Sequence, residues 1–156
     1  MIRAEGKKDI LVVCSGNTCR SAIGEFLLKE EIKNSAKSLD NYYIHSAGVT
    51  AIEGLEASEN AVSVLKEIGI EAKTHESTVL TEKMVEDASL ILTMTNSHKN
   101  YLLQTLPKNK DKVYTLKGFA GMGDSDVIDP FGGGIDIYRK TRTEIGDCVK
   151  KIVQKI

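Results

Sequence analysis

Tryptophan is absent from this chain of 156 residues, proline occurs twice and cysteine three times. Three cysteines are an odd number and too few for a disulfide framework, so we expect a reducing, cytoplasmic compartment in which a thiol stays reactive. No apolar run approaches the length of a membrane span, and residues 1–9 lack the apolar middle of a signal peptide. These absences argue against a disulfide-stapled secreted domain and against a membrane partner.

The chain also lacks an excess of charge of either sign, because its 21 Lys and Arg residues nearly balance its 22 Asp and Glu residues. Binding to nucleic acid through a basic surface is therefore not expected. The three histidines, His45, His75 and His98, do not have the spacing of metal ligands. We expect neither a metal site nor a cofactor.

Short apolar runs alternate with amphipathic segments along the chain. Strands are expected at 10–13, 42–46, 90–95 and 112–116, and helices at 21–34, at 58–68, after Thr81, from an Asn96 cap to Pro107, and at 135–156. This order predicts an α/β fold: a three-layer sandwich, with a four-stranded parallel sheet and helices on both faces. We see no repeat and no linker, so residues 1–156 are expected to form one domain. Ligands of such folds bind beyond the carboxyl ends of the strands, which the glycine-rich loop 118–134 can also reach.

The most informative segment runs from Cys14 to Ser21 and reads Cys-Ser-Gly-Asn-Thr-Cys-Arg-Ser. It lies between the first strand and the first helix, where successive backbone N–H groups form an anion nest. Gly16 is expected to let the backbone turn inward without a Cβ clash. Arg20 adds a planar guanidinium that binds two phosphate oxygens at once. The sequence therefore predicts a phosphate-binding loop directly after the first strand.

A thiol inside such a loop is a nucleophile. The positive field of the loop favours the thiolate form of Cys14, which can attack phosphorus in line. Ser21 is expected to donate a hydrogen bond to that thiolate, and Asn17 to hold the loop by side-chain hydrogen bonds to neighbouring backbone. The other loop residues expected to contact the phosphate or the substrate are Ser15, Thr18 and Cys19. The alternative, a buried cysteine near an unrelated arginine, fits the bare Cys-x5-Arg spacing but does not explain Gly16, Asn17 and Ser21 between a strand and a helix.

The segment 13–21 resembles the active-site loop of the low-molecular-weight protein tyrosine phosphatases. The resemblance covers nearly the whole chain and continues, in the family's order, through Ser46-Ala47-Gly48, the strand at 90–95 and Asp129-Pro130-Phe131-Gly132. One departure is visible: the family usually has proline after Ser21, and this chain has Ala22. Proline suits the first turn of a helix but is not required there.

The resemblance implies the roles of the site residues. Cys14 would form a phosphocysteine intermediate, Arg20 would bind the phosphate and Asp129 would be the general acid. The ligands implied are phosphorylated proteins and phosphate or other oxyanions, and nothing suggests an obligate assembly, so a monomer is expected. Cys19 either has only a packing role or, as the resemblance favours, forms a disulfide with an oxidised Cys14.

Two residues bear on the phosphorylated group. The position of Thr18 is commonly isoleucine in the tyrosine phosphatases, and threonine there with Phe131 further on resembles the bacterial protein-arginine phosphatases. The Thr18 hydroxyl can hydrogen-bond near the P–N bond of a phosphoarginine. Phe131 would form one side of the substrate-binding slot and stack on a flat guanidinium. Phosphoarginine is therefore the expected substrate, with phosphotyrosine as the alternative.

Three other functions share parts of this pattern. Thioredoxin-coupled arsenate reduction needs a further cysteine pair, which is lacking between Cys19 and Cys148. A phosphocysteine carrier that passes phosphate to a sugar needs no hydrolytic acid, and Asp129 argues against it. A redox sensor or binding module without turnover does not require the complete set of Cys14, Arg20 and Asp129. These readings remain as alternatives to hydrolysis.

Overall fold

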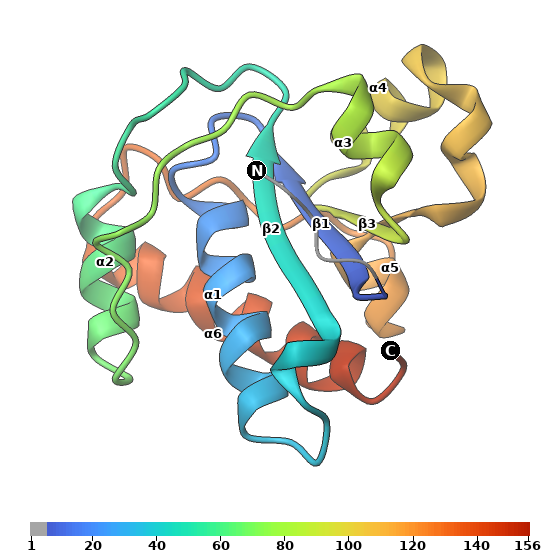
Figure 1. Ribbon diagram of the computed structural model, residues 1–156. Coiled ribbons are helices and arrows are strands. Elements are labelled where there is room, and N and C mark those ends of the chain that lie inside the picture. The colour runs from blue at the N-terminus through green and yellow to red at the C-terminus, as the bar shows by residue number, and fades with distance from the viewer. Residues whose placement is uncertain (1–5) are drawn as a thin grey trace.

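The structure is a computed structural model that describes residues 6–156 (Figure 1). Part of the polar N-terminal segment, residues 1–5, lies outside the described residues. The strands are β1 (Lys8–Cys14), β2 (Tyr42–Gly48), β3 (Leu90–Thr93) and β4 (Val113–Thr115). They form one four-stranded sheet in the order β2-β1-β3-β4, and every pairing is parallel.

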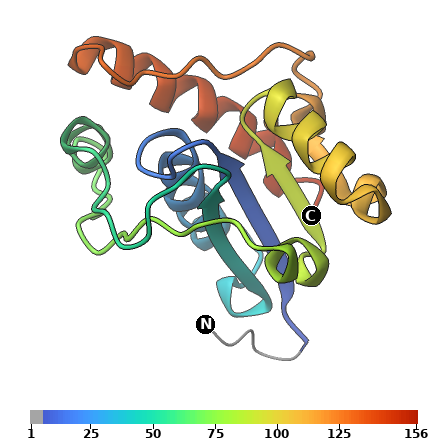
Figure 2. The ribbon, with the colours of Figure 1, turned by 90° about the horizontal axis from the view of Figure 1, so that it is seen from above.

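Helices cover both faces of this sheet, as predicted for a three-layer α/β fold. They are α1 (Arg20–Lys33), α2 (Glu59–Lys66), α3 (Glu82–Asp87), α4 (Asn96–Thr105), α5 (Leu116–Ala120) and α6 (Ile135–Val153), with two 3-10 turns at Leu39–Asn41 and Pro107–Lys112. In Figure 1 α1 and α6 lie on one side of the strands and α3 and α4 on the other, and Figure 2 shows the same arrangement from above. No helix within residues 6–156 is long and apolar enough to cross a membrane.

The central strand β1 is apolar on both faces because both faces are covered. Ile10 and Val12 pack into the larger hydrophobic cluster, with α1, α2 and α6, whereas Leu11 and Val13 pack into the smaller one, with α3 and α4. All four side chains are essentially excluded from solvent. An uninterrupted apolar run is the pattern that a strand of a doubly covered parallel sheet requires.

The strand order creates a topological switch point at the carboxyl end of β1. The chain leaves β1 toward β2 on one side, while β3 lies on the other side, so the connections after β1 and β3 diverge. Such switch points are where open parallel sheets bind ligands. The long segment after α5 reaches the same edge, because the backbone N–H of Val127 donates to the carbonyl of Met94 at 2.9 Å. The fold therefore brings three distant connections together at one edge.

Two local predictions are wrong. Thr95, not Asn96, caps α4: its hydroxyl accepts from the backbone N–H of His98 at 3.1 Å. The long loop predicted at 118–134 also begins later, because α5 occupies its first residues. Thr115 caps the N-terminus of α5, and Gly121 ends this helix in a left-handed conformation at φ 72°. Five residues are too short a segment for helical periodicity to be recognised in sequence.

Candidate active site

Cys14 is the last residue of β1 and is only 2% exposed. Its Sγ lies 2.8 Å from the hydroxyl of Ser21, in the first turn of α1, and accepts from the backbone N–H of Asn17 at 3.3 Å. The sulfur thus has two polar partners from the loop that surrounds it.

Asn17 holds the loop in shape. It is fully buried and has a left-handed φ of 58°, which asparagine tolerates better than most residues. Its amide donates to the hydroxyls of Ser21 at 2.7 Å and Ser46 at 2.9 Å, and its oxygen accepts from the backbone N–H of Thr78 at 2.8 Å. Neighbouring backbone groups were the partners expected for the Asn17 side chain, but it bonds instead to two serine hydroxyls and to a backbone N–H 61 residues away in the chain.

Gly16 does not have the role predicted for it. A Cβ built there would meet only the Thr18 hydroxyl, at 3.9 Å, and the backbone of Gly16 is not left-handed. The close approach occurs at Gly48 instead, where a Cβ would lie 2.2 Å from the carbonyl oxygen of Ser15. The turn of the loop therefore depends on Asn17, and its packing depends on a glycine in another strand.

Two further side chains, His75 and Ser46, take part in the network around Asn17, and of these only Ser46 belongs to a motif of the family resemblance. The ring of His75 donates through Nε2 to the Asn17 carbonyl at 2.7 Å, and Ser46 donates to a Glu25 oxygen at 2.5 Å. His75 was considered only as a metal ligand. Its actual partner is 58 residues away in the chain, and no local pattern signals such a contact.

Arg20 and Asp129 meet beside the loop. Arg20 is buried at the start of α1, donates through Nη1 to the Val127 carbonyl at 3.0 Å, and places Nη2 3.5 Å from an Asp129 oxygen. The Asp129 carboxylate is half exposed and accepts from the backbone N–H of Phe131 at 3.1 Å. The Phe131 side chain is 79% exposed. A carboxylate, a guanidinium and a thiol from three segments are thus gathered at one edge of the sheet.

Cys19 lies on the opposite side of the loop, against α6. Its Sγ is 3.3 Å from the Tyr138 hydroxyl and 3.4 Å from the Ser58 hydroxyl, and Ser58 donates its backbone N–H to the carbonyl of Thr18 at 2.9 Å. Burial and the Cys19 contact raise the pKa of Tyr138 to about 12, so the phenol stays protonated and can donate to sulfur. Thr18 itself is partly buried.

A second histidine touches the loop from α4. Nε2 of His98 lies 2.8 Å from the Ser15 hydroxyl, and Nδ1 lies 3.0 Å from the Thr95 hydroxyl. His98 is only 6% exposed. Burial, assisted by the charge of Arg20, lowers the pKa of His98 to about 4, so the ring is neutral at pH 7.

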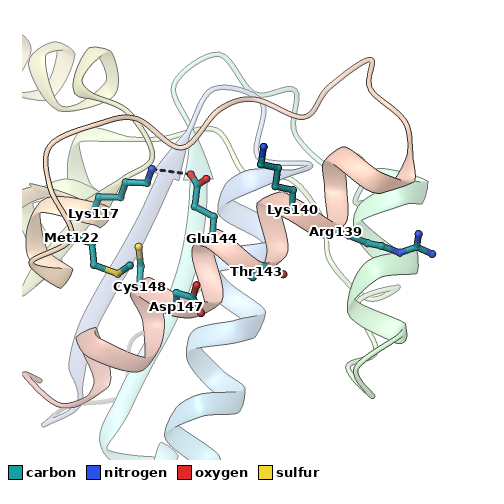
Figure 3. A pocket seen from close by; sticks show the side chains of 8 residues that line it. All are labelled: Lys117, Met122, Arg139, Lys140, Thr143, Glu144, Asp147 and Cys148. Carbon is teal, nitrogen blue, oxygen red and sulfur yellow. Dashed lines mark ion pairs between the residues drawn. The ribbon is translucent and has the colours of Figure 1, made fainter.

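A separate cavity of about 490 Å³ lies along α6, away from the cysteine loop (Figure 3). Its lining residues are Lys117, Met122, Arg139, Lys140, Thr143, Glu144, Asp147 and Cys148. Lys117 pairs with Glu144 at 3.1 Å. Cys148 is fully buried, as predicted for a core residue, and burial raises the pKa of its thiol. No group of three or more His, Cys, Asp or Glu side chains among residues 6–156 is arranged to hold a metal ion.

A thiol and an arginine at the two ends of one loop between a strand and a helix, with a carboxylate beside the arginine, are features of enzymes that cleave phosphate through a thiolate. The family model described as low molecular weight phosphotyrosine protein phosphatase matches residues 9–156. The chain belongs to this family and is a low-molecular-weight phosphatase.

Curated relatives differ in the substrate that their names give. The chain is 43% identical over 147 residues to a protein-arginine-phosphatase of Geobacillus stearothermophilus, covering 94% of this chain and 95% of that protein. It is 33% identical over 143 residues to the low molecular weight protein-tyrosine-phosphatase PtpB of Staphylococcus epidermidis strain RP62A, covering 92% and 95%.

Solved structures share the fold over nearly the whole length. A mutant of the YwlE arginine phosphatase with a phosphorylated active site serine has a TM-score of 0.89 and 39% identity, and the match covers 94% of each chain. The tyrosine phosphatase Wzb of Escherichia coli K30, in complex with sulphate, has a TM-score of 0.85 and 28% identity, covering 96% of this chain and 98% of that one. Members of this fold thus carry a phosphorylated active-site side chain or bind an oxyanion.

Proposed function

We propose that this protein hydrolyses phosphoarginine in phosphorylated proteins by way of a phosphocysteine on Cys14. The observation that carries the proposal is the placement of the Arg20–Asp129 contact, at 3.5 Å, beside the loop that holds Cys14. This placement brings together a nucleophile (Cys14), a phosphate-binding cation (Arg20) and a proton donor (Asp129) in one site. The arginine phosphatases among the relatives support the substrate.

In the first step, the Cys14 thiolate attacks phosphorus and the P–N bond breaks. Asp129 gives its proton to the leaving nitrogen, so the arginine side chain departs as an intact guanidinium. Arg20 and the backbone N–H groups of residues 15–20 balance the charge on the three phosphoryl oxygens. The products of this step are a phosphocysteine and a dephosphorylated arginine.

In the second step, water attacks the phosphocysteine. Asp129, now ionised, accepts a proton from that water, and the S–P bond breaks to release inorganic phosphate. The departing Cys14 thiolate is stabilised by the Ser21 hydroxyl at 2.8 Å and by the Asn17 N–H at 3.3 Å. The enzyme returns to its starting state without any cofactor.

The residues around Asp129 suit a flat, charged leaving group. Phe131 stands exposed two residues beyond Asp129 and offers an aromatic face on which a guanidinium can stack. Thr18 brings a hydroxyl to the loop, where an isoleucine would bring only apolar contact. In this proposal the substrate slot is formed by Ser15, Thr18 and Phe131, above the phosphate-binding loop.

The proposal includes a reversible oxidation of the site. An oxidised Cys14 would be captured by Cys19 as a disulfide, which a thiol reductant can open again. Both residues are free thiols in the structure. Free thiols fit a cytoplasmic enzyme, and we propose that it acts as a monomer on phosphoproteins, without nucleic acid or membrane as a partner.

Phosphate release from matched phosphoarginine and phosphotyrosine peptides tests the proposal, with the Cys14→Ser variant as the blank. The expected result is a strong preference for phosphoarginine. A preference for phosphotyrosine would keep the mechanism and overturn the substrate. Release from neither peptide by the wild-type protein would overturn hydrolysis and favour arsenate reduction, phosphate carriage or a sensor.

A further inference from the structure

The contact between Ser15 and His98 joins the phosphate-binding loop to α4 and has no part in the mechanism above. Ser15 directly follows Cys14, and its carbonyl oxygen accepts from the backbone N–H of Thr50 at 3.0 Å, which fixes its backbone. Its hydroxyl lies 2.8 Å from Nε2 of His98. Ser15 is partly exposed, whereas His98 is buried. A buried partner therefore contacts the hydroxyl of a partly exposed loop residue.

Several charged groups surround this contact. Arg20 acts on His98 from the phosphate-binding side, and Asp126 and Asp129 act on it from the loop that carries the general acid. The Ser15–His98 pair is thus placed near both groups that handle the phosphate and the leaving group.

The neutral ring of His98 has one donor and one acceptor nitrogen. When Nδ1–H donates to the Thr95 hydroxyl, Nε2 is left to accept the hydroxyl proton of Ser15. The lone pairs of the Ser15 oxygen are then free to accept hydrogen bonds from a bound group. A hydroxyl that donates to one partner is also a better acceptor for another, because hydrogen bonds in a chain polarise one another.

We propose that His98 is a positioning residue that turns the Ser15 oxygen toward the substrate slot, where it accepts an N–H of the phosphorylated guanidinium group. This inference rests on the proposed function and adds to it a pair of specificity residues. A guanidinium carries several N–H donors, whereas the ring of phosphotyrosine offers only carbon at that place. A site built to hydrogen-bond its substrate discriminates against an analogue that lacks the partner, because its polar group is then left unpaired.

Two amide variants of His98 separate positioning from mere packing. In His98→Gln the amide can reach the place of Nε2 and still bind Ser15, whereas in His98→Asn it reaches only the place of Nδ1, near Thr95. We expect H98N and S15A each to lower the ratio of kcat/KM for a phosphoarginine peptide over a phosphotyrosine peptide about tenfold. H98Q is expected to keep most of the wild-type ratio. The double variant S15A/H98N should lose no more than either single variant, since both remove one interaction.

The outcomes are distinguishable. Equal losses for both peptides in H98N, a ratio in H98Q as low as in H98N, or additive losses in the double variant would overturn this inference and leave phosphoarginine hydrolysis standing. A wild-type protein without activity on phosphoarginine would overturn both. Thermal melting of each variant shows that the compared proteins are folded.

Discussion

At the scale of single residues, the site depends on polar side chains that are buried. Asn17 and Ser21 are fully excluded from solvent and His98 nearly so, yet each has its hydrogen-bond partners. A buried polar group without partners costs free energy, whereas a satisfied network fixes one geometry. The cradle is thus rigid before any phosphate arrives, which is what stabilisation of a charged transition state requires.

The low pKa of His98 predicts a specific dependence of stability on pH. The unfolded chain has a histidine pKa near 6.5, and the folded protein holds His98 at about 4, so the unfolded state binds more protons between these values. The stability contributed by neutral His98 is complete above about pH 6.5 and is lost as pH falls toward 4. Denaturant unfolding of wild type and H98Q should therefore show that wild type loses about 1–3 kcal/mol more between pH 7 and pH 4. Parallel losses in the two proteins would contradict the assignment.

Thr18 gives a second prediction at this scale. Thr18→Ile should raise phosphotyrosine activity relative to phosphoarginine activity several-fold, because an apolar branch replaces the hydroxyl near the P–N bond. Thr18→Val is the matched control, since it removes the hydroxyl with little change in shape. Steady-state kinetics on both peptides provide the measurement. An unchanged ratio in T18I would show that this residue does not set specificity.

At the scale of elements, the cysteine loop is shaped by its neighbours. Gly48, at the end of β2, leaves room for the backbone of Ser15, and the same strand supplies Ser46 to Asn17. Parallel pairing of Cys14 with Gly48 sets this register. A strand next to β1 therefore contributes both the space and a hydrogen bond that the loop needs.

Gly48→Ala tests this dependence. The added Cβ would lie 2.2 Å from a backbone oxygen, so the loop or the strand must shift, and we expect a loss of about 1–3 kcal/mol in unfolding free energy. Gly16→Ala, in the loop itself, meets no atom closer than 3.9 Å and is the control for stability. Chemical denaturation of both variants provides the comparison. A larger loss in G16A than in G48A would contradict the packing described.

At the scale of the whole molecule, the fold gives three thiols three environments. Cys14 has polar partners in the cysteine loop and at the start of α1, Cys19 contacts Tyr138 and Ser58 between the loop and α6, and Cys148 is a fully buried residue of α6. Thiol reactivity follows thiolate character and access, not sequence position. The three cysteines should therefore differ widely in reactivity while the protein is folded.

Alkylation with iodoacetamide, followed by peptide mass mapping, checks this difference. Cys14, the proposed nucleophile, should react first and be protected by phosphate or vanadate, and Cys148 should react last, because burial raises the pKa of its thiol and disfavours the reactive thiolate. In urea all three should react at similar rates. Alkylation of Cys148 as fast as Cys14 in the folded protein would contradict these environments.

Local patterns along the chain were enough to predict the fold class and the position of the cysteine loop. The apolar run of β1 ending at Cys14, followed by an amphipathic helix, predicted a strand, a phosphate-binding turn and a helix, because local periodicity and composition decide such units. The family resemblance added Asp129, which the structure brings to 3.5 Å from Arg20. Short-range features of the chain were sufficient for these conclusions.

Which distant side chains support the loop became clear only from the three-dimensional packing. Residues 14–17 are contacted from other elements by His75, His98, Ser46 and Gly48. The motif Ser46-Ala47-Gly48 contributed to the family resemblance, but no local pattern predicted that these residues contact the loop. The same holds for the distinction between Gly16 and Asn17, since backbone conformation there is fixed by the partners of the Asn17 side chain. Local pattern specifies elements, but hydrogen bonds between elements form only when the sheet order has placed them side by side.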